Sequence, residues 1–216
     1  MELIEKGCIS QLLDSSILIT GTAGSGKTRT IQKLTKELLQ RGKRICLLDF
    51  TGNHINLAEH HGKTFMNQVN LNEIAETSKN LYRITFNKEI LFFKEECNVD
   101  FLNEISSEVD YVIVDEAQHL FARSKEFEIE RLLNNGIKVI LALENLECFE
   151  IATVMNLKRL MNELLLRQHN NDLAYLQDGE GLLIWQNQII SRIYLDERIR
   201  VNEKRDSRKN YAVHRG

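Results

Sequence analysis

Short apolar runs alternate with amphipathic stretches along most of this chain. Continuous apolar runs are typical of parallel strands, because helices cover both faces of such a sheet. The runs expected to form buried strands are Ser16–Thr20, Arg44–Asp49, Tyr111–Glu116 and Ile137–Leu143. The pattern therefore predicts an α/β fold with a mostly parallel sheet and helices on both faces.

The end of the chain has a different pattern. Two apolar segments, Gly181–Gln186 and Ile189–Leu195, flank a connection of hairpin length, Asn187-Gln188. This arrangement predicts a C-terminal antiparallel β-hairpin.

Helical periodicity separates several of the strand-like runs. Ile31, Leu34 and Leu38 share one face of a helix that Gly42 is expected to end. Further helices are expected at 125–134, which Gly136 would stop, and at 151–167, where an apolar stripe recurs at helical spacing. Between residues 51 and 107 the pattern is weaker. It favours extended pieces at 64–66 and 82–86, and helices around 71–79, 88–97 and 100–108.

The sequence GTAGSGKT, Gly21 through Thr28, directly follows the first apolar run. It matches the G-x-x-x-x-G-K-[ST] pattern, with a predicted strand before it and a helix after it. In such a loop the backbone N–H groups cradle phosphate oxygens at the N-terminus of the helix. Lys27 is expected to reach the β- and γ-phosphates of ATP, and the Thr28 hydroxyl to take one Mg²⁺ coordination position. The predicted nucleotide-binding residues are Gly21, Thr22, Ala23, Gly24, Ser25, Gly26, Lys27, Thr28 and Arg29.

Two acids, Asp115 and Glu116, close the apolar run that begins at Tyr111. Such a strand delivers carboxylates to its C-terminal end, the edge at which open α/β sheets bind ligands. Asp115 alone would also suit a helix cap. In a phosphate-loop enzyme the first acid holds Mg²⁺, and the second can orient and deprotonate the attacking water. We therefore predict Thr28 and Asp115 as metal ligands, with Glu116 and Lys27 as catalytic residues.

The strand predicted at 137–143 is followed by two polar residues, Glu144 and Asn145. A polar side chain at this point would stand beside the γ-phosphate and would be able to sense it. Either residue would equally suit a turn, so both are candidate sensors only.

Three histidines, His54, His60 and His61, follow the second predicted strand. No acid or cysteine completes a zinc-binding spacing with them, so a solvated polar loop is expected. The cysteines lie far apart without a C-x-x-C pair, which excludes a zinc ribbon and a dithiol redox motif.

Composition agrees with one large domain over residues 1–196, followed by a charged, flexible tail over 197–216. A hydrophobic content of 43% and a charged content of 27% are those of a soluble globular protein. No apolar run has the length of a membrane helix, and the acidic start is unlike a signal peptide, so a cytoplasmic location is expected. A net charge of −3 argues against a surface that grips nucleic acid throughout, but seven basic residues between Lys27 and Arg44 leave local DNA contact open.

The order of these signals resembles the FtsK/HerA superfamily of P-loop ATPases, which includes DNA-pumping motors and conjugative type IV secretion ATPases. The similar elements are GTAGSGKT, the early strand in LLDFTGN, DEAQHL, which is similar to the family's DEA-x-x-L, the strand in VILALEN, and the hairpin GEGLLIWQNQIISRIYLD. The resemblance spans about residues 7–196. The hairpin discriminates most, since superfamily 1 helicases continue into a second core at that point.

The resemblance implies a nucleotide site between the subunits of a ring, usually a hexamer, with an arginine finger supplied in trans. Arg159 and Arg167 lie in the stretch where that finger is expected. The sequence departs from the family in two respects: Glu144 stands where the family tends to have glutamine, and the short chain leaves little room for accessory domains.

The leading hypothesis is a Mg²⁺-dependent ATPase that works as an oligomeric motor or switch on DNA or a DNA-associated partner. One alternative is a superfamily 1 helicase-like NTPase fragment, which DEAQ suggests; VILALEN, however, lacks the G-D-x-x-Q expected there. Another is a regulatory module that binds ATP with little turnover, favoured by the modest size and by Glu144. A small-molecule kinase is a weaker alternative, because the sequence contains no recognisable acceptor site or lid.

Overall fold

The structure, a computed structural model, describes residues 5–8, 12–66, 74, 78–86, 101–121, 126–144, 157–166, 180–185 and 188–194. Its strands are β1 (Glu5–Cys8), β2 (Ile17–Thr20), β3 (Ile45–Asp49), β4 (Gly62–Met66), β5 (Leu81–Thr85), β6 (Tyr111–Asp115), β7 (Lys138–Leu143), β8 (Asn162–Leu166), β9 (Glu180–Trp185) and β10 (Gln188–Tyr194). Its helices are α1 (Lys27–Gln40), α2 (Ile55–His61), α5 (Phe101–Ile105), α6 (Gln118–Phe121) and α7 (Glu126–Asn134), and residues 157–160 form one further helical turn.

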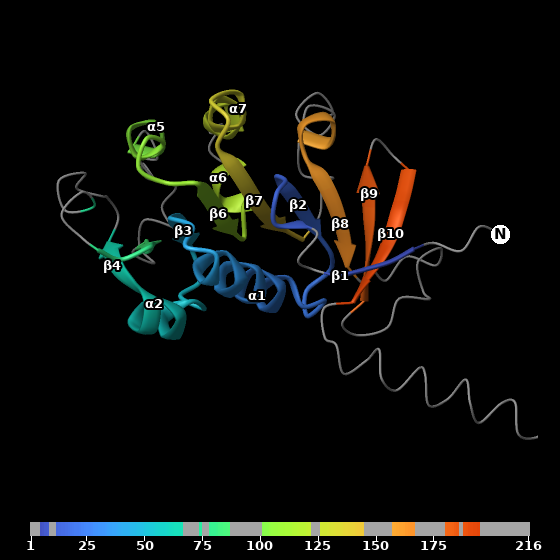
Figure 1. Ribbon diagram of the computed structural model, residues 1–216, viewed down its shortest axis with the longest axis horizontal. Helices are drawn as coiled ribbons and strands as arrows, with labels where there is room; N and C mark the ends of the chain where they lie inside the picture. Colours follow the sequence, from blue (N-terminus) through green and yellow to red (C-terminus); the bar gives the residue numbers. More distant parts are fainter. Residues whose placement is uncertain are drawn as a thin grey trace, which may run out of the picture.

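All these strands belong to one ten-stranded sheet in the order β1-β10-β9-β8-β2-β7-β6-β3-β5-β4. Every neighbouring pair from β8 to β4 is parallel. In contrast, β9 is antiparallel to both β8 and β10. The predicted mostly parallel sheet with a C-terminal antiparallel hairpin is therefore confirmed (Figure 1).

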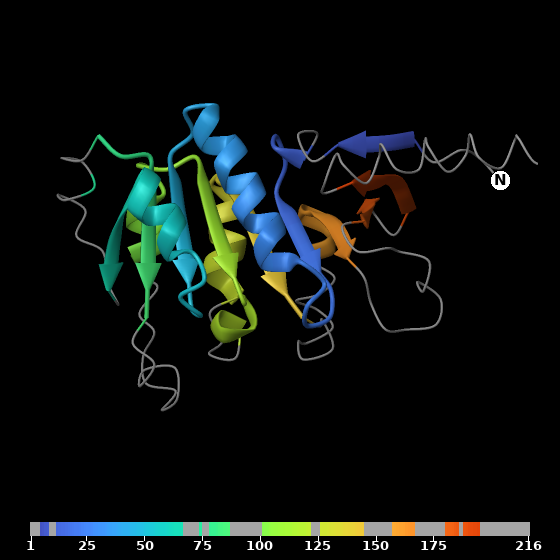
Figure 2. The ribbon, with the colours of Figure 1, turned by 90° about the horizontal axis from the view of Figure 1, so that it is seen from below.

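The centre of the sheet brings the sequence motifs to one edge. Strand β7 separates β2 from β6, and the register places Thr20 opposite Leu143 and Val114 opposite Leu141. Parallel strands end at the same edge of a sheet, and β2, β6, β7 and β3 point the same way in Figure 2. The segments that follow β2, β6 and β7 therefore meet around the end of β7.

Helices cover both faces of the sheet, which explains why its central strands β2, β3, β6 and β7 are mostly apolar on both sides. Helices α1 and α2 lie on one face, and α5 and α7 lie on the other (Figure 1). Successive residues of β3 belong to opposite cores: Leu47 packs in the cluster that contains Leu34 of α1, and Leu48 packs in the cluster that contains Ile129 of α7. A strand covered on both sides has no solvated face to alternate with.

Helix α1 ends as the sequence predicts. Gly42 adopts a left-handed conformation (φ 72°). Its N–H donates to the Leu39 carbonyl (3.0 Å), and the Lys43 N–H donates to the Leu38 carbonyl (3.0 Å). These two hydrogen bonds form a Schellman motif, which satisfies the last carbonyls of the helix.

The helix predicted over 151–167 is wrong in its second half. Residues 157–160 are helical, but Asn162–Leu166 form β8, which lies between β2 and β9. Leu164 packs in the core beneath α1, whereas Leu165 packs on the opposite face with Leu182. The helical turn is followed by a strand with apolar residues on both faces, and together they give the apolar spacing that is typical of a longer helix.

Other expectations outside the centre had mixed outcomes. The extended pieces expected at 64–66 and 82–86 correspond to β4 and β5, and the helix expected at 100–108 corresponds to α5. The helices expected at 71–79 and 88–97 lie largely outside the described residues, as does the whole segment 197–216. Strand β1 precedes the first strand expected from the sequence, and it pairs in parallel with β10. None of the described helices is long and apolar enough to cross a membrane.

A buried carboxylate, that of Glu163, lies where β2 pairs with β8, and its contact with Thr20 can be used to test the pairing of these two strands. Glu163 is 7% exposed; it accepts a hydrogen bond from the Thr20 hydroxyl (3.2 Å) and pairs with the Lys158 ammonium (3.0 Å). We expect Thr20→Val to lower the free energy of unfolding by about 1–2 kcal/mol, because one carboxylate oxygen loses its donor. Urea unfolding measures this. The control is Thr64→Val at an exposed position of β4, expected to change stability by less than about 0.5 kcal/mol. Equal midpoints for the two variants would contradict the pairing.

Candidate nucleotide-binding site

The loop between β2 and α1 depends on glycine at three points. Gly24 (φ 76°) and Gly26 (φ 98°) are left-handed, a conformation that glycine adopts without steric cost. A Cβ on Gly21 would lie 2.5 Å from the Ser25 Oγ. The loop therefore curls back on itself at the N-terminus of α1.

Lys27 lies inside this curl. Its side chain is buried, and its ammonium donates to the carbonyl oxygens of Gly21 (2.9 Å) and Thr22 (3.2 Å). The first main-chain bond of α1 runs from the Thr30 N–H to the Gly26 carbonyl (2.9 Å), so the preceding amides have no intrahelical acceptor. Main-chain amides at the start of a helix, together with an ammonium group, suit a phosphate group.

Asp115 ends β6 with a fully buried carboxylate. Its Oδ2 accepts hydrogen bonds from the Thr28 hydroxyl (2.9 Å) and from His54 Nε2 (2.8 Å), and its Oδ1 accepts one from the Glu116 N–H (3.1 Å). The structure thus brings together the two residues predicted to bind metal. Hydroxyl and carboxylate oxygens are the ligands that Mg²⁺ prefers, so this pair fits that ion.

Glu116 has an unusual backbone. It is the non-glycine residue with positive φ (57°) in the described part of the chain, a conformation that costs an L-residue about 1–2 kcal/mol. The turn is held by a bond from the Ala117 N–H to the Ala142 carbonyl of β7 (2.7 Å). The Glu116 carboxylate accepts a hydrogen bond from the Gln118 amide.

A cavity of about 580 Å³ lies between the phosphate loop and Glu116. Its size is within the range of small-molecule sites. It is lined by Ala23, Gly24, Gly26, Lys27, Thr28, Arg29, Gln32, Glu116 and Glu144. The loop, the second acid and one candidate sensor therefore face the same space.

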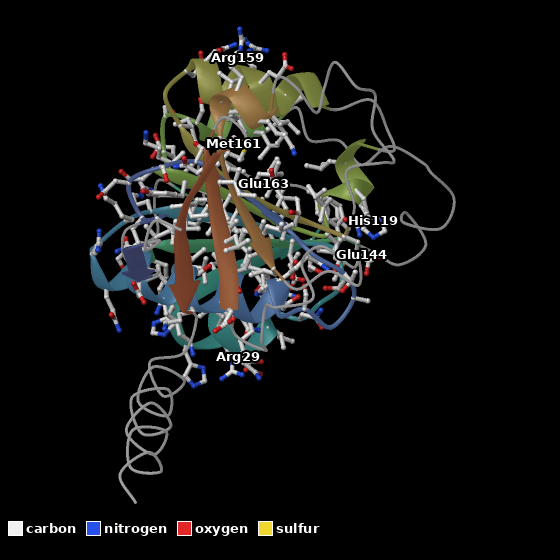
Figure 3. All side chains as sticks on the ribbon, turned by 90° about the vertical axis from the view of Figure 1, so that its right-hand side faces the viewer. Arg29, His119, Glu144, Arg159, Met161 and Glu163 are labelled. Atoms are coloured by element: carbon white, nitrogen blue, oxygen red, sulfur yellow. The ribbon has the colours of Figure 1, made fainter. Side chains whose placement is uncertain are left out.

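The remaining predicted residues are not brought to this cavity. Arg159 is exposed on the helical turn before β8, and Figure 3 shows it on a different side of the molecule from Glu144 and Arg29. Arg159 therefore does not line the cavity of its own chain. Asn145 and Arg167 lie outside the described residues.

The expectation of a solvated loop is wrong for His54. His60 and His61 are exposed, as expected, but they lie in helix α2 and not in a loop. His54 is completely buried and contacts Asp115. The reason is the turn that follows β3. There Asp49 Oδ1 accepts the N–H groups of Gly52 (2.9 Å) and Asn53 (3.1 Å), and Oδ2 accepts that of His54 (3.0 Å), which folds the turn inward.

Asp49 and Arg83 form a second buried charged pair beside the site. Both side chains are at most 5% exposed, and Arg83 Nε donates to Asp49 Oδ2 at 2.7 Å. Asp49 lies opposite Asp115 in the register of β3 and β6. Two signals were visible in the sequence: an apolar run that ends in an acid, and an arginine inside another apolar run. Nothing local marked His54, whereas Gln118 lies in the DEAQ string noted in the sequence.

Comparison with known proteins assigns the family. The family described as "Helicase HerA, central domain" matches residues 8–202. The chain belongs to this family. The HerA-type P-loop fold expected from the motifs is therefore shown, and a comparison with curated protein sequences gave no match.

Solved structures share the fold of this HerA-type domain. VirB4 of Thermoanaerobacter pseudethanolicus has a TM-score of 0.60 at 11% identity, over 83% of this chain and 88% of that one. B204, the DNA-packaging ATPase of Sulfolobus turreted icosahedral virus, has a TM-score of 0.56 at 16% identity, over 79% and 91%. The genome packaging NTPase B204 of Sulfolobus turreted icosahedral virus 2, in complex with ATP-gammaS, has a TM-score of 0.53 at 13% identity, over 79% and 91%.

The buried pair of the HerA-type domain provides a stability prediction. We expect Arg83→Met to lower the free energy of unfolding by about 3 kcal/mol, because the buried Asp49 carboxylate loses its cationic partner. The control is Lys43→Met. Lys43 pairs with Asp110 at 3.6 Å, and both side chains are more than 40% exposed, so a loss below about 1 kcal/mol is expected. Urea unfolding of both variants checks this, and similar losses would contradict the role of Arg83.

Proposed function

We propose that the protein is a Mg²⁺-dependent ATPase that works as an oligomeric motor or switch on DNA or a DNA-associated partner. The observation that carries the ATPase proposal is the contact between Thr28 of the phosphate loop and Asp115 of β6, at a cavity that Glu116 also lines. The DNA role is supported by membership of a family described as a helicase domain. It is also supported by the fold shared with a viral DNA-packaging ATPase.

The residues at the cavity suit hydrolysis of the bond between the β- and γ-phosphates. In the proposed reaction a water oxygen attacks the γ-phosphorus, the bond to the bridging oxygen breaks, and ADP and inorganic phosphate leave. The Glu116 carboxylate orients the water and takes its proton. Lys27 and the amides of the loop hold the phosphate oxygens, and Thr28 and Asp115 would hold Mg²⁺. Bound there, Mg²⁺ would neutralise charge on the phosphate oxygens.

Two substitutions separate binding from turnover. We expect Lys27→Ala to weaken binding of an ATP analogue by roughly 100-fold or more, because charge-assisted hydrogen bonds to phosphate are lost. We expect Glu116→Gln to bind normally and to lose at least about 100-fold in turnover, because an amide cannot accept the proton. Fluorescent-analogue titration and phosphate release measure the two effects.

The control for these variants is Lys36→Ala, at an exposed position of the same helix, which should behave as the unmodified protein. Full turnover in the Glu116→Gln protein would overturn the role of that carboxylate.

A shared site between subunits is the second part of the proposal. Arg159 is exposed and lies away from its own cavity, as a residue that serves a neighbouring copy must be. Arginine fingers supplied in trans commonly raise turnover by about 10³–10⁵. Arg167 remains an alternative donor from the same stretch of the chain.

Assembly has a kinetic consequence. The rate of ATP hydrolysis per protomer is expected to rise steeply with protein concentration and then to level off, because each site is complete only beside a neighbour. Duplex DNA is expected to raise the rate further. Phosphate release over a dilution series, with and without DNA, measures both effects. A rate per protomer that is constant over the series would argue for a site complete in one chain.

A regulatory module that binds ATP with little turnover is the second candidate. It is favoured by the contact that holds the Glu116 carboxylate on the Gln118 amide, and by an acid, Glu144, at the expected sensor position. DNA-stimulated phosphate release in the preceding experiment would exclude this candidate.

A further inference from the structure

His54 lies outside the sequence motifs, yet the structure places its side chain against Asp115. Its side chain is completely buried, and its Nε2 lies 2.8 Å from Asp115 Oδ2. A carboxylate oxygen only accepts, so this contact is a hydrogen bond donated by the ring N–H. The Thr28 hydroxyl donates to the same oxygen at 2.9 Å.

These contacts fix the orientation of the Asp115 carboxylate. His54 and Thr28 bind one of its oxygens, and the Glu116 N–H binds the other at 3.1 Å. A carboxyl group held at both oxygens cannot turn about its last side-chain bond. The direction in which its remaining lone pairs point is therefore set before any ligand arrives.

The main chain of His54 is itself fixed by hydrogen bonds. Its backbone N–H donates to Asp49 Oδ2 (3.0 Å), which also accepts from Arg83 (2.7 Å). Its carbonyl accepts the Ala58 N–H (3.2 Å) at the start of α2. Gln32 of α1 lines the cavity, and its side-chain amide donates to the Asn53 carbonyl (3.1 Å). The main chain at His54 is therefore held by hydrogen bonds to the turn after β3 and to α2, and the neighbouring Asn53 is held by one from α1.

Packing alone does not account for the choice of histidine. The second ring nitrogen, Nδ1, is buried without a hydrogen-bond partner among the described residues. A leucine would fill the same space without leaving a polar atom unpaired. The Nε2–H donor directed at Asp115 is what the histidine provides.

We infer that His54 is a positioning residue for the metal site, which donates Nε2–H to Asp115 Oδ2 and so sets the affinity for the divalent cation bound with nucleotide. The inference rests on the proposed function. Groups that orient a metal ligand in this way typically contribute roughly 10- to 100-fold to metal affinity.

The test compares His54→Leu, which removes the donor, with His54→Gln, whose terminal amide places a donor near the position of Nε2. The control is His60→Leu, at an exposed position of α2. Binding of Mn²⁺ is measured by the loss of its free EPR signal with the protein in molar excess over a non-hydrolysable ATP analogue. A sample of the analogue without protein is the reference, because the free analogue also chelates Mn²⁺. Binding of the analogue is measured separately in EDTA.

We expect His54→Leu to weaken Mn²⁺ binding roughly 10- to 100-fold while the metal-free affinity for the analogue stays within about twofold. We expect His54→Gln to recover most of the loss and His60→Leu to match the unmodified protein. Unchanged Mn²⁺ affinity in His54→Leu would overturn the inference. So would a fall in metal-free nucleotide binding equal to the fall in Mn²⁺ binding, because that pattern marks a structural role.

Two further results keep the inference separable from the proposed function and from misfolding. If the unmodified protein binds the analogue without any dependence on metal, the proposed function fails first. If the unmodified protein binds the analogue in a metal-dependent way and His54→Leu has the same Mn²⁺ affinity, only the role of His54 fails.

Should His54→Leu not fold, NMR of ¹⁵N-histidine in the unmodified protein decides, with His54→Gln identifying the signal. A protected Nε2–H signal that moves when Mg²⁺ and nucleotide bind supports the role, and the absence of a proton on Nε2 overturns it.

Discussion

The carboxylate of Asp115 has no exposed surface, and a buried carboxylate is tolerated only where donors surround it. Its donors come from the first turn of α1, from the turn after β3 and from its own turn. The phosphate loop and β6 are not neighbours in the sheet, because β7 lies between them. The bond from Thr28 to Asp115 therefore crosses the end of β7 and links the phosphate-binding half of the site to the acidic half.

Asp49 and Asp115 each end a buried strand, and the two are level in the register. Asp49 accepts main-chain N–H groups from the turn that follows it, whereas Asp115 accepts the side-chain hydroxyl of Thr28 from the phosphate loop. Buried ion pairs contribute little net stability compared with apolar residues of the same volume. Their value here is geometric: Arg83 holds Asp49, Asp49 holds the backbone of His54, and His54 holds Asp115.

The sequence predicted the centre of the fold well, because β2, β3, β6 and β7 are covered on both faces and had to be apolar throughout. GTAGSGKT and Asp115–Glu116 were recognisable because each combines a short local pattern with an apolar run. The prediction failed for β8, where a helical turn and a short strand share the spacing of one helix. It failed for His54 because a polar residue is buried or solvated according to its partners. That partner lies 61 positions away, where no local pattern reveals it.

The pairing of β1 with β10 joins residues near the two ends of the described chain, with Glu5 opposite Ser191. During synthesis the strands from β2 to β8 emerge before the hairpin that covers them. Until β9 is made, the outer edge of β8 presents a row of unpaired amides and carbonyls next to β2, the strand that precedes the phosphate loop. Open edges of this kind pair readily with other chains. The hairpin that distinguishes this sheet thus also closes this edge, after the parallel strands have been made.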